Sequence, residues 1–382
     1  MKTLNRRSFL KVSVMAGSSA AIMPGAMARA ESHSFSRVIG ANDDVRYAVV
    51  GFGGRGKDHL KEMREVKGTR LVALCEVDQN TLNRELKQCE NRGERVQAYT
   101  DVRKLLENPD IDVVTFATPN HWHSLGSIWA VQAGKDVYVE KPVSHEVWEG
   151  RQLVKAARKY NRIVQAGTQC RSSQGIAEAI DWMRQGQLGK VIRARGLCYK
   201  RRPSIGKVSG PQPIPPGVDY DLWCGPAPKL PLMRSKLHYD WHWVWPTGNG
   251  DLGNQGIHQM DLARWILGEK QLSPGVWSVG GRLGYVDDGT TPNTLIVFHD
   301  YKPAPLIFEV RGLPSSSDSK QMDRYHGADI GVVTDLEGGS MVIPSYSKAI
   351  FYDKDGKEVK TFDGSSSHFA NFIGAVRSRR SS

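Results

Sequence analysis

Two stretches of this 382-residue chain carry side chains that could oxidise an alcohol. Lys141 ends an apolar run of strand length and precedes a proline, which favours an extended backbone at the lysine. An ammonium group there would orient a substrate hydroxyl and stabilise the alkoxide that develops on it. His258 would take the hydroxyl proton, because imidazole titrates near neutrality. Asn254, four residues earlier, is expected to share one helix face with His258.

A glycine-rich turn indicates what would accept the hydride. The apolar run 45–50 stops in a G-x-G-x-x-G pattern that contains Gly51, Gly53, Gly54, Arg55 and Gly56. The first glycine allows a tight turn, the second lets a pyrophosphate approach the backbone, and the third lets the next helix pack closely. A second apolar run ends in Glu76, about where such units place the carboxylate that binds ribose. The pattern predicts a dinucleotide site. Glu76 favours NAD, because a carboxylate repels the 2′-phosphate of NADP, while Arg55 leaves NADP open.

The elements that must position these residues form two predicted domains. Between residues 45 and 167, strand-like runs alternate with helical patterns, and the strands are expected at 45–50, 70–76, 96–99, 112–119, 136–142 and 163–166. This alternation predicts a Rossmann domain with a doubly wound parallel sheet. Ligands bind outside the carboxyl ends of such strands. The cofactor contacts expected there are Thr118, Asn120, His123, Glu140, Lys141 and Gln169.

After Gly167 the pattern changes. Residues 168–382 are predicted to form an α+β domain that binds substrate, with a large, mostly antiparallel sheet and helices on one face. The expected helices are 174–185, 252–267 and 368–376, and the expected strands are 191–199, 276–285, 294–299, 306–311, 331–335, 340–343, 348–353 and 359–362. The proline-rich stretch 201–232 is predicted to be an irregular loop. The chain stops directly after an amphipathic helix, which leaves an incomplete C-terminus open.

The first thirty residues are typical of a twin-arginine export signal. Arg6 and Arg7 precede an apolar, small-residue run, and Ala28-Arg29-Ala30 offers a cleavage site. The run is too short and too rich in small residues for a membrane span, although an uncleaved anchor is the alternative. Residues 31–44 are expected to be a flexible leader. The signal predicts a periplasmic or extracytoplasmic protein. Without a nicotinamide pool there, the cofactor is expected to stay bound and to be regenerated on the enzyme.

Composition excludes several other functions. Removing the five basic residues of the signal lowers the net charge from +12 to +7. The basic runs 200–202 and 377–380 lack interleaved aromatic residues, so we interpret them as solvated surface and expect no nucleic-acid partner. Five cysteines without a C-x-x-C pair predict neither a disulfide framework nor a zinc site. No acid or cysteine at ligand spacing joins His121 and His123, so no metal is expected.

In order along the chain, the glycine-rich turn, the stretch Thr118-Pro119-Asn120-His121-Trp122-His123, the triplet Glu140-Lys141-Pro142 and the pattern Gly256-x-His258-x-x-Asp261 resemble the Gfo/Idh/MocA oxidoreductases, the group of glucose–fructose oxidoreductase and inositol dehydrogenase. The resemblance spans about residues 45–372. It implies that Lys141 lies beside the nicotinamide and the substrate hydroxyl, that His258 accepts the proton, and that the protein forms homo-oligomers. The family pattern has an aspartate where this chain has Asn254, and an amide can neither act as a base nor raise a histidine pKa by charge. Either His258 works without a charged partner, or the reaction differs from simple dehydrogenation.

Aromatic residues of the second half suit a carbohydrate substrate. The segment 239–245 holds three tryptophans, and flat rings fit the apolar face of a pyranose. The expected substrate contacts are Arg171, Trp241, His242, Asn254 and His258. The leading hypothesis is an NAD(P)-dependent oxidoreductase with a retained cofactor that acts on a sugar, a glycoside or a cyclic polyol. The alternatives are a redox-neutral enzyme that oxidises a glycoside transiently and eliminates its aglycone, and a sugar-binding protein with a structural dinucleotide.

Overall fold

The structure is a computed structural model that describes residues 39–40, 43–316 and 319–380. The expected signal peptide and most of the expected leader therefore lie outside the described residues. Within the described part of the chain, no helix is both long and apolar enough to cross a membrane.

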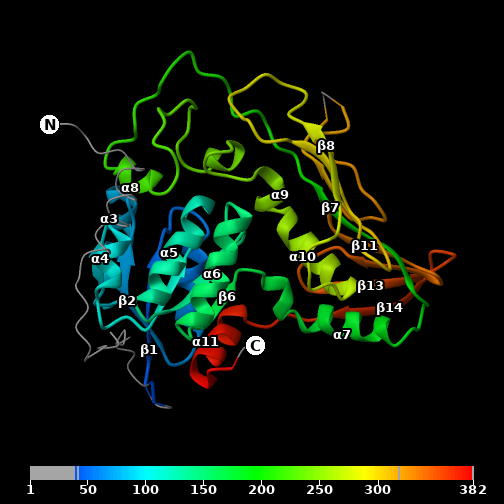
Figure 1. The fold of residues 1–382 in the computed structure, drawn as a ribbon, viewed down its shortest axis with the longest axis horizontal. Coiled ribbons are helices and arrows are strands. Elements are labelled where there is room, and N and C mark those ends of the chain that lie inside the picture. Colours follow the sequence, from blue (N-terminus) through cyan, green and yellow to red (C-terminus); the bar gives the residue numbers. More distant parts are fainter. Residues whose placement is uncertain (1–38, 41–42, 317–318, 381–382) are drawn as a thin grey trace, which may run out of the picture. The chain divides into compact units, whose positions relative to one another are not determined.

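The first sheet contains six parallel strands in the order β3-β2-β1-β4-β5-β6. Figure 1 labels three of them, β1, β2 and β6. The strands are β1 (Val45–Val50), β2 (Thr69–Cys75), β3 (Gln97–Tyr99), β4 (Val113–Phe116), β5 (Asp136–Val139) and β6 (Val164–Ala166). The helices between them are α2 (Gly56–Glu65), α3 (Gln79–Asn91), α4 (Val102–Leu106), α5 (Asn120–Gln132) and α6 (Val147–Lys159). Strands β4 and β5 are buried throughout, as expected for a parallel sheet covered on both faces. The strand order reverses between β1 and β4, which creates the crevice where ligands bind in this fold.

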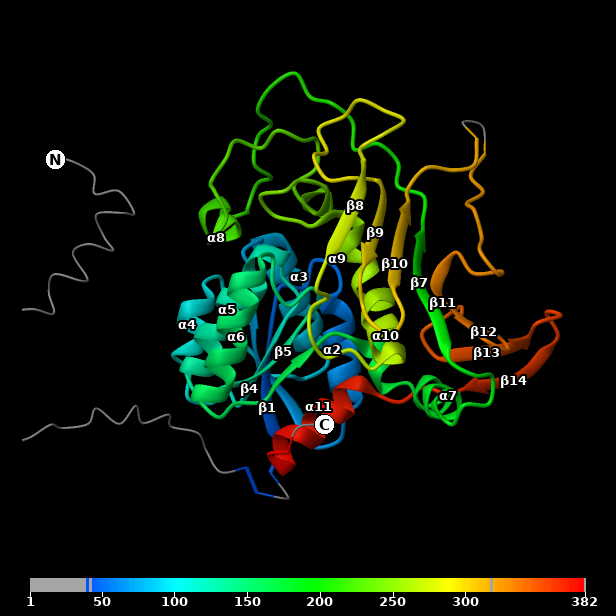
Figure 2. The ribbon, with the colours of Figure 1, turned by 45° about the vertical axis from the view of Figure 1, so that its right-hand side comes forward.

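The second sheet has eight strands in the order β14-β13-β12-β11-β7-β10-β9-β8. They are β7 (Val191–Tyr199), β8 (Val276–Gly281), β9 (Thr294–His299), β10 (Leu306–Arg311), β11 (Ile330–Leu336), β12 (Gly339–Ile343), β13 (Lys348–Asp353) and β14 (Glu358–Asp363). The β7–β10 pair is parallel and the other pairs are antiparallel. Helices α7 (Gln174–Arg184) and α10 (Gly256–Leu267) pack on this sheet around a shared apolar core (Figure 2). The predicted fold class, a Rossmann sheet followed by a mostly antiparallel sheet, is confirmed.

The helix predicted over 252–267 is wrong in one respect, because it is broken. A short helix α9 (Gly250–Asn254) ends before α10 begins, and Gln255 separates them. Asn254 and His258 therefore do not share one face of a continuous helix. A Cβ on Gly256 would lie 2.1 Å from the Phe308 ring, so only a glycine lets the backbone of α10 start directly against the sheet.

The proline-rich stretch is less irregular than predicted. It contains a short helix α8 (Tyr220–Cys224), which begins where the side chain of Asp219 accepts a hydrogen bond from the backbone N–H of Leu222. An aspartate at this position caps the free donors of the first turn. The other short elements of the second half are two 3₁₀ turns, η1 (Gln169–Ser172) and η2 (Asp240–Trp243).

The last helix requires a correction to the predicted domain boundary. Helix α11 (His368–Ser378) belongs to the apolar core of the first domain, where Phe369 and Phe372 pack near Tyr138 of β5. The ring centroids of Tyr138 and Phe369 are 4.4 Å apart. A single division after Gly167 therefore assigns this helix to the wrong core. The helix is amphipathic, but amphipathicity alone does not show which domain it covers.

Candidate cofactor and active site

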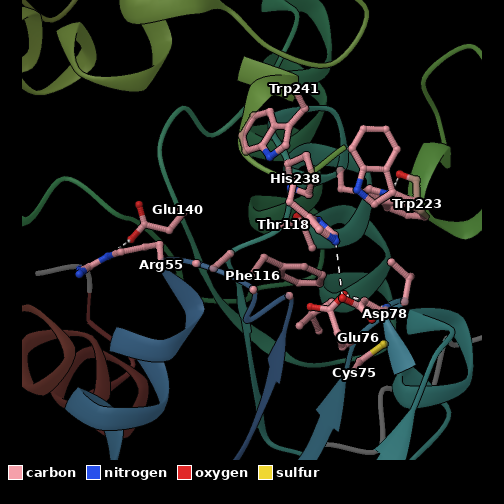
Figure 3. A pocket seen from close by; sticks show the side chains of 18 of the residues that line it. Arg55, Cys75, Glu76, Asp78, Phe116, Thr118, Glu140, Trp223, His238 and Trp241 are labelled. Carbon is pink, nitrogen blue, oxygen red and sulfur yellow. Dashed lines mark hydrogen bonds and ion pairs between the residues drawn. The ribbon is translucent and has the colours of Figure 1, made fainter. Parts of the chain in front are cut away.

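A cavity of about 560 Å³ opens at the carboxyl ends of β1, β2, β4 and β5 (Figure 3). Its first-domain lining includes most of the predicted cofactor contacts: Gly51, Gly53, Gly54, Arg55, Glu76, Thr118, Asn120, His123, Glu140 and Lys141. The second half of the chain contributes Leu222, Trp223, His238, Tyr239, Trp241, His242 and Asn254. The cavity thus lies where the topology of a doubly wound sheet places a nucleotide.

The glycine-rich turn leaves room for a pyrophosphate. Gly51 adopts φ +77°, which only glycine adopts readily, and a Cβ on Gly56 would lie 2.0 Å from the carbonyl oxygen of Gly51. By contrast, a Cβ on Gly53 or Gly54 would have nothing within 4 Å. The hydroxyl of Thr118, across the cavity, is buried without a hydrogen-bond partner in the described structure. Open space at the N-terminus of α2 together with an unsatisfied hydroxyl fits a bound dinucleotide.

Glu76 lies at the end of β2 and is 9% exposed. Its two carboxylate oxygens accept hydrogen bonds from the backbone N–H groups of Phe52 (3.0 Å) and Asp78 (3.2 Å). Burial raises the pKa of Glu76, and these two N–H groups oppose that rise. The carboxylate therefore fixes the glycine-rich turn while it faces the cavity. Asp78, which sequence reasoning missed, lines the same region and lies 3.5 Å from the ring nitrogen of His238.

Glu140 is a buried centre of ionic and hydrogen bonds. It accepts hydrogen bonds from Arg55 (3.1 Å) and Gln169 (3.1 Å) and lies 3.2 Å from Nε2 of His59. Burial opposes its ionisation, but the hydrogen bond with His59 and the nearby positive charges prevail, so its pKa is held well below the usual range. Glu140 thus fixes the strand end that carries Lys141. Gln169 is used in this network and is not part of the cavity lining.

Residues at the start of α5 join the two halves of the chain. The ring nitrogens of His123 lie 2.6 Å from the carbonyl oxygen of Pro142 and 2.8 Å from that of Thr118. Both ring nitrogens of His123 therefore contact protein carbonyl oxygens, and His123 lines the cavity without a free ring nitrogen. Asn120 donates a hydrogen bond of 2.9 Å to the side chain of Asn249, just before α9. The His123 contacts join the ends of β4 and β5 within the first domain, and the Asn120 contact holds the start of α5 against the second domain.

Lys141 contacts the second domain directly. Its ammonium group donates a hydrogen bond of 2.6 Å to the main-chain oxygen of Asn254. Burial lowers the pKa of Lys141. His258 is 4% exposed, and burial followed by the charge of Lys141 lowers its pKa to about 3. Its imidazole is consequently neutral at pH 7, and its Nδ1 is buried without a hydrogen-bond partner among the described residues.

His258 is not part of the cavity lining, although the charge of Lys141 acts on it. Its ring centroid lies 5.1 Å from that of Tyr346, whose hydroxyl accepts a hydrogen bond of 2.9 Å from Gln255. His258 thus lies outside the described cavity lining, and its ring contacts Tyr346 of the second domain.

The other predicted substrate contacts divide into two groups. Trp241 and His242 line the cavity and stack on each other with ring centroids 3.6 Å apart. Arg171 does not line it, because its guanidinium pairs with Asp261 at 2.7 Å and covers the ring of Trp265. The structure therefore brings Arg171 together with Asp261 and away from the cavity.

A segment that includes much of the predicted loop and the tryptophan-rich stretch contributes to the lining of the cavity. We call residues 212–245 the strap. The backbone N–H of Gln79 donates to the carbonyl of Gly217 (2.9 Å), and that of Asp219 donates to Val77 (3.0 Å). Trp122 donates its indole N–H to the carbonyl of Leu222 (3.1 Å). Four buried residues give the strap its own apolar cluster: Trp223, Cys224, Leu232 and Leu237. Backbone pairing of this kind leaves no signal in side-chain patterns.

One charge of the basic run 200–202 is not solvated, which corrects the sequence interpretation. Arg202 is 9% exposed, and its guanidinium makes two hydrogen bonds, of 2.6 and 2.7 Å, to the carboxylate of Asp251, which is 1% exposed. A buried charge requires such a partner. The partner lies 49 residues away in the sequence, so the run itself could not reveal it.

Two family models match the chain in order. Residues 45–168 match the Gfo/Idh/MocA model described as an oxidoreductase family with an NAD-binding Rossmann fold. Residues 187–288 match the model of the C-terminal alpha/beta domain of the same oxidoreductase family. The chain therefore carries the NAD-binding Rossmann fold of that family together with its second domain.

Curated relatives and solved structures extend the comparison. A glycosyl hydrolase family 109 protein of Saccharopolyspora erythraea is 27% identical over 266 residues, which are 65% of this chain and 52% of that protein. Glycosyl hydrolase family 109 protein 2 of Shewanella sp. strain ANA-3 is 27% identical over 206 residues, 50% of this chain and 45% of that protein. The chain thus spans about half the length of the curated relatives it matches.

Among solved structures, levoglucosan dehydrogenase in complex with NADH and levoglucosan superimposes with a TM-score of 0.65 at 18% identity, covering 89% of this chain and 92% of that one. The WlbA dehydrogenase of Bordetella pertussis, in complex with NADH and UDP-GlcNAcA, gives a TM-score of 0.64 at 17% identity, with 88% and 89% covered. At these identities the likeness shows the fold.

Proposed function

Because this chain belongs to the Gfo/Idh/MocA oxidoreductase family, we propose that it oxidises a secondary hydroxyl of a sugar, a glycoside or a cyclic polyol. The observation that supports this most is the position of Lys141. Its ammonium group faces the cavity, is fixed by the main-chain oxygen of Asn254, and lies close enough to His258 to lower the pKa of that histidine. A fixed cation beside a neutral imidazole suits the removal of a hydroxyl proton.

The residues of the chain would divide the work as follows. Bound NAD supplies the hydride acceptor. The glycine-rich turn and Glu76 would hold its pyrophosphate and adenosine ribose. Lys141 would donate a hydrogen bond to the substrate oxygen and stabilise the charge that develops on it. His258 would receive the hydroxyl proton on a ring nitrogen, since its low pKa keeps the imidazole unprotonated.

The strap supports retention of the cofactor. Trp223, His238 and Trp241 lie over the cavity (Figure 3), and the strap pairs with the backbone of residues 77–79. Bonds that hold these side chains over the cavity would slow the release of a nucleotide beneath them. The test is to denature the purified protein and identify any released nucleotide by mass. Release of stoichiometric NAD supports retention, and a nucleotide-free protein that binds NAD reversibly and weakly contradicts it.

A redox-neutral reaction is the second candidate. The curated relatives named above are described as glycosyl hydrolases, and a retained cofactor suits a cycle in which the hydride returns to the substrate. In such a cycle the transient ketone acidifies the neighbouring C–H, and the glycosidic bond is eliminated. Mixing the protein with an aryl glycoside separates the candidates. Lasting formation of reduced nicotinamide supports net oxidation, whereas release of the aglycone without net reduction supports the redox-neutral cycle.

We further propose that the protein is exported by the twin-arginine route. The proposal rests on the paired residues Arg6 and Arg7 and the following apolar run. Cell fractionation of the parent and of an Arg6→Lys/Arg7→Lys variant tests it. The parent is expected outside the cytoplasm and the variant inside, and equal distributions would contradict export by this route. The family resemblance also implies that the protein forms homo-oligomers. This stays a prediction, which a molar mass measured by light scattering would test.

A further inference from the structure

The pair formed by Arg202 and Asp251 connects the rigid second sheet to Lys141. The backbone of Arg202, just after β7, is fixed at both ends: its N–H donates to Gly312 (2.8 Å), and its carbonyl accepts from the hydroxyl of Tyr285. The guanidinium then holds the Asp251 carboxylate through two parallel hydrogen bonds of 2.6 and 2.7 Å. Bidentate arginine–carboxylate pairs fix orientation as well as distance.

Asp251 is one helical turn before the oxygen that binds Lys141. It lies in α9, three residues ahead of Asn254, and its own carbonyl accepts the hydrogen bond from Gln255 that closes the turn. The main-chain oxygen of Asn254 then receives the Lys141 ammonium at 2.6 Å. A displacement of Asp251 would therefore move this acceptor, because the five-residue helix transmits it as one unit.

The guanidinium of Arg202 also fixes the strap. It donates a hydrogen bond of 3.2 Å to the hydroxyl of Tyr239 and lies 4.9 Å from the centroid of the Trp243 ring. Tyr239 lines the cavity and has φ +66°, a backbone conformation that a tyrosine adopts rarely. The contact with Arg202 is one of the interactions that hold this residue in place.

We propose that the Arg202–Asp251 pair positions Lys141 for the reaction. The pair acts through α9, and neither member lines the cavity, so both are positioning residues. The proposal deepens the proposed function and rests on it for the chemical role of Lys141. The arrangement also explains how an asparagine can replace the family's aspartate at position 254: the main-chain oxygen contacts the lysine, and the carboxylate lies one turn earlier at Asp251.

The charges of the pair act on Lys141 in opposite directions, and this gives a measurable signature. The negative charge of Asp251 raises the pKa of Lys141, and the positive charge of Arg202 lowers it. Five other charged or titratable groups act on Lys141 or are acted on by it. They come from its own strand end, from the turn before α2, from α5, from η2 and from α10: Glu140, Arg55, His123, His242 and His258. While both members of the pair are present, their opposite effects on the pKa of Lys141 partly cancel. Removing either member leaves the other uncompensated.

The experiment measures the pKa of Lys141 without relying on catalysis. The purified full chain is labelled with acetic anhydride across a pH series, and the acetylation of Lys141 is quantified by peptide mass spectrometry. The variants are Asp251→Asn and Arg202→Met, with Asp136→Asn as the control. Asp136 is equally buried and paired with Arg379 at 2.7 Å, but it begins β5 at the end opposite Lys141.

The expected shifts have opposite signs. Asp251→Asn should lower the apparent pKa of Lys141 and Arg202→Met should raise it, because each substitution removes a charge that acts on the ammonium group. The Arg202→Met/Asp251→Asn double variant should return it close to the parent value, and Asp136→Asn should not move it. Shifts of the same sign, or no shift in either single variant, would overturn the proposal. If a single variant does not fold, the double variant decides, because a pKa unlike that of the parent contradicts the compensation.

Activity profiles separate this proposal from the proposed function. If Lys141 acts as an ammonium, the alkaline limb of kcat should move with the labelling pKa, to lower pH in Asp251→Asn and to higher pH in Arg202→Met. If the pKa of Lys141 shifts in opposite directions in the two single variants but the parent protein has no oxidoreductase activity, the effect of the pair on Lys141 is supported and the proposed function is refuted. An active enzyme whose Lys141 pKa ignores both substitutions would refute the positioning role alone.

Discussion

Two glycines of the turn after β1 should respond to alanine in opposite ways. A methyl group on Gly56 would lie 2.0 Å from the carbonyl oxygen of Gly51 and 3.0 Å from its carbonyl carbon, whereas ordinary contacts begin near 3.4 Å. The start of α2 would have to move away from β1 by more than 1 Å to relieve this contact. Overpacking of this kind costs about 1–3 kcal/mol, and the upper end applies here because backbone atoms cannot rotate away.

Gly53 is the matched position three residues earlier. A Cβ there meets nothing within 4 Å, and the residue does not have a positive φ. Alanine should therefore leave the nucleotide-free protein as stable as the parent, or more stable by about 0.4–1 kcal/mol through the unfolded chain. The methyl group would, however, fill the space where a pyrophosphate approaches the backbone. We expect the Kd for NAD to rise about tenfold or more, which corresponds to about 1.4 kcal/mol of binding free energy.

Thermal unfolding of nucleotide-free protein, with and without added NAD, measures both effects. At a concentration of 100 times the parent Kd, NAD should stabilise the parent by about 2.7 kcal/mol and the Gly53→Ala variant by about 1.4 kcal/mol or less. Gly56→Ala should lower the Tm without NAD by several degrees. Calorimetric titration gives the Kd values independently. A Gly53→Ala variant that binds NAD as tightly as the parent would refute the assignment of this open space to the pyrophosphate.

Three further predictions concern the residues around the cavity. Lys141→Met should reduce kcat by about 10²–10³, as the loss of one donor to a developing oxyanion does, and should leave the nucleotide content of the purified protein unchanged. Trp241→Ala should accelerate nucleotide release, measured by exchange with labelled NAD. Trp245→Ala is the control and should not accelerate release, because the Trp245 side chain is 47% exposed and lies outside the cavity lining. His258 titrates at about 3 in the folded state against 6.5 in the unfolded chain, so the stability it contributes is present above pH 6.5 and is lost as the pH falls toward 3. A His258→Gln variant should accordingly lose less stability than the parent in chemical denaturation between those pH values, and equal losses would contradict a buried neutral histidine.

Sequence periodicity predicted the strands well because burial leaves a clear pattern. β7, β9, β10 and β13 have the expected bounds, and the expected alternation of strands and helices gave the parallel sheet. Periodicity failed where the tertiary structure decides. The apolar spacing continues across the break at Gln255 and does not show it, and the place of α11 depends on a core more than 200 residues away in the chain.

The nucleotide end of the site was predictable for a related reason. The glycine-rich turn and Glu76 are local signals, because each residue acts through its own backbone or at the end of its own strand. The substrate end depends on pairings between distant segments. The sequence predicts that Arg171 contacts the substrate, but its guanidinium pairs with Asp261. The sequence likewise predicts that Arg202 is solvated, but its guanidinium pairs with the distant Asp251. The strap attaches to residues 77–79 through backbone hydrogen bonds, which the sequence pattern cannot show, and to Trp122 and Arg202 through side chains from distant segments.

The balance of charge around Lys141 bears on why position 254 tolerates an amide. Three cations and two carboxylates act together here: Arg55, Arg202 and Lys141 against Glu140 and Asp251. The neighbouring His258 stays neutral at pH 7 because its pKa is about 3, and the charge of Lys141 is one of the causes of this low pKa. The same ammonium charge favours an alkoxide, whose negative charge develops as the hydroxyl proton leaves. An aspartate at position 254 would raise the pKa of His258 by its charge, whereas an amide does not. With Asp251 holding Arg202 and the main-chain oxygen of Asn254 holding Lys141, the amide at 254 leaves the imidazole unprotonated over a wider pH range.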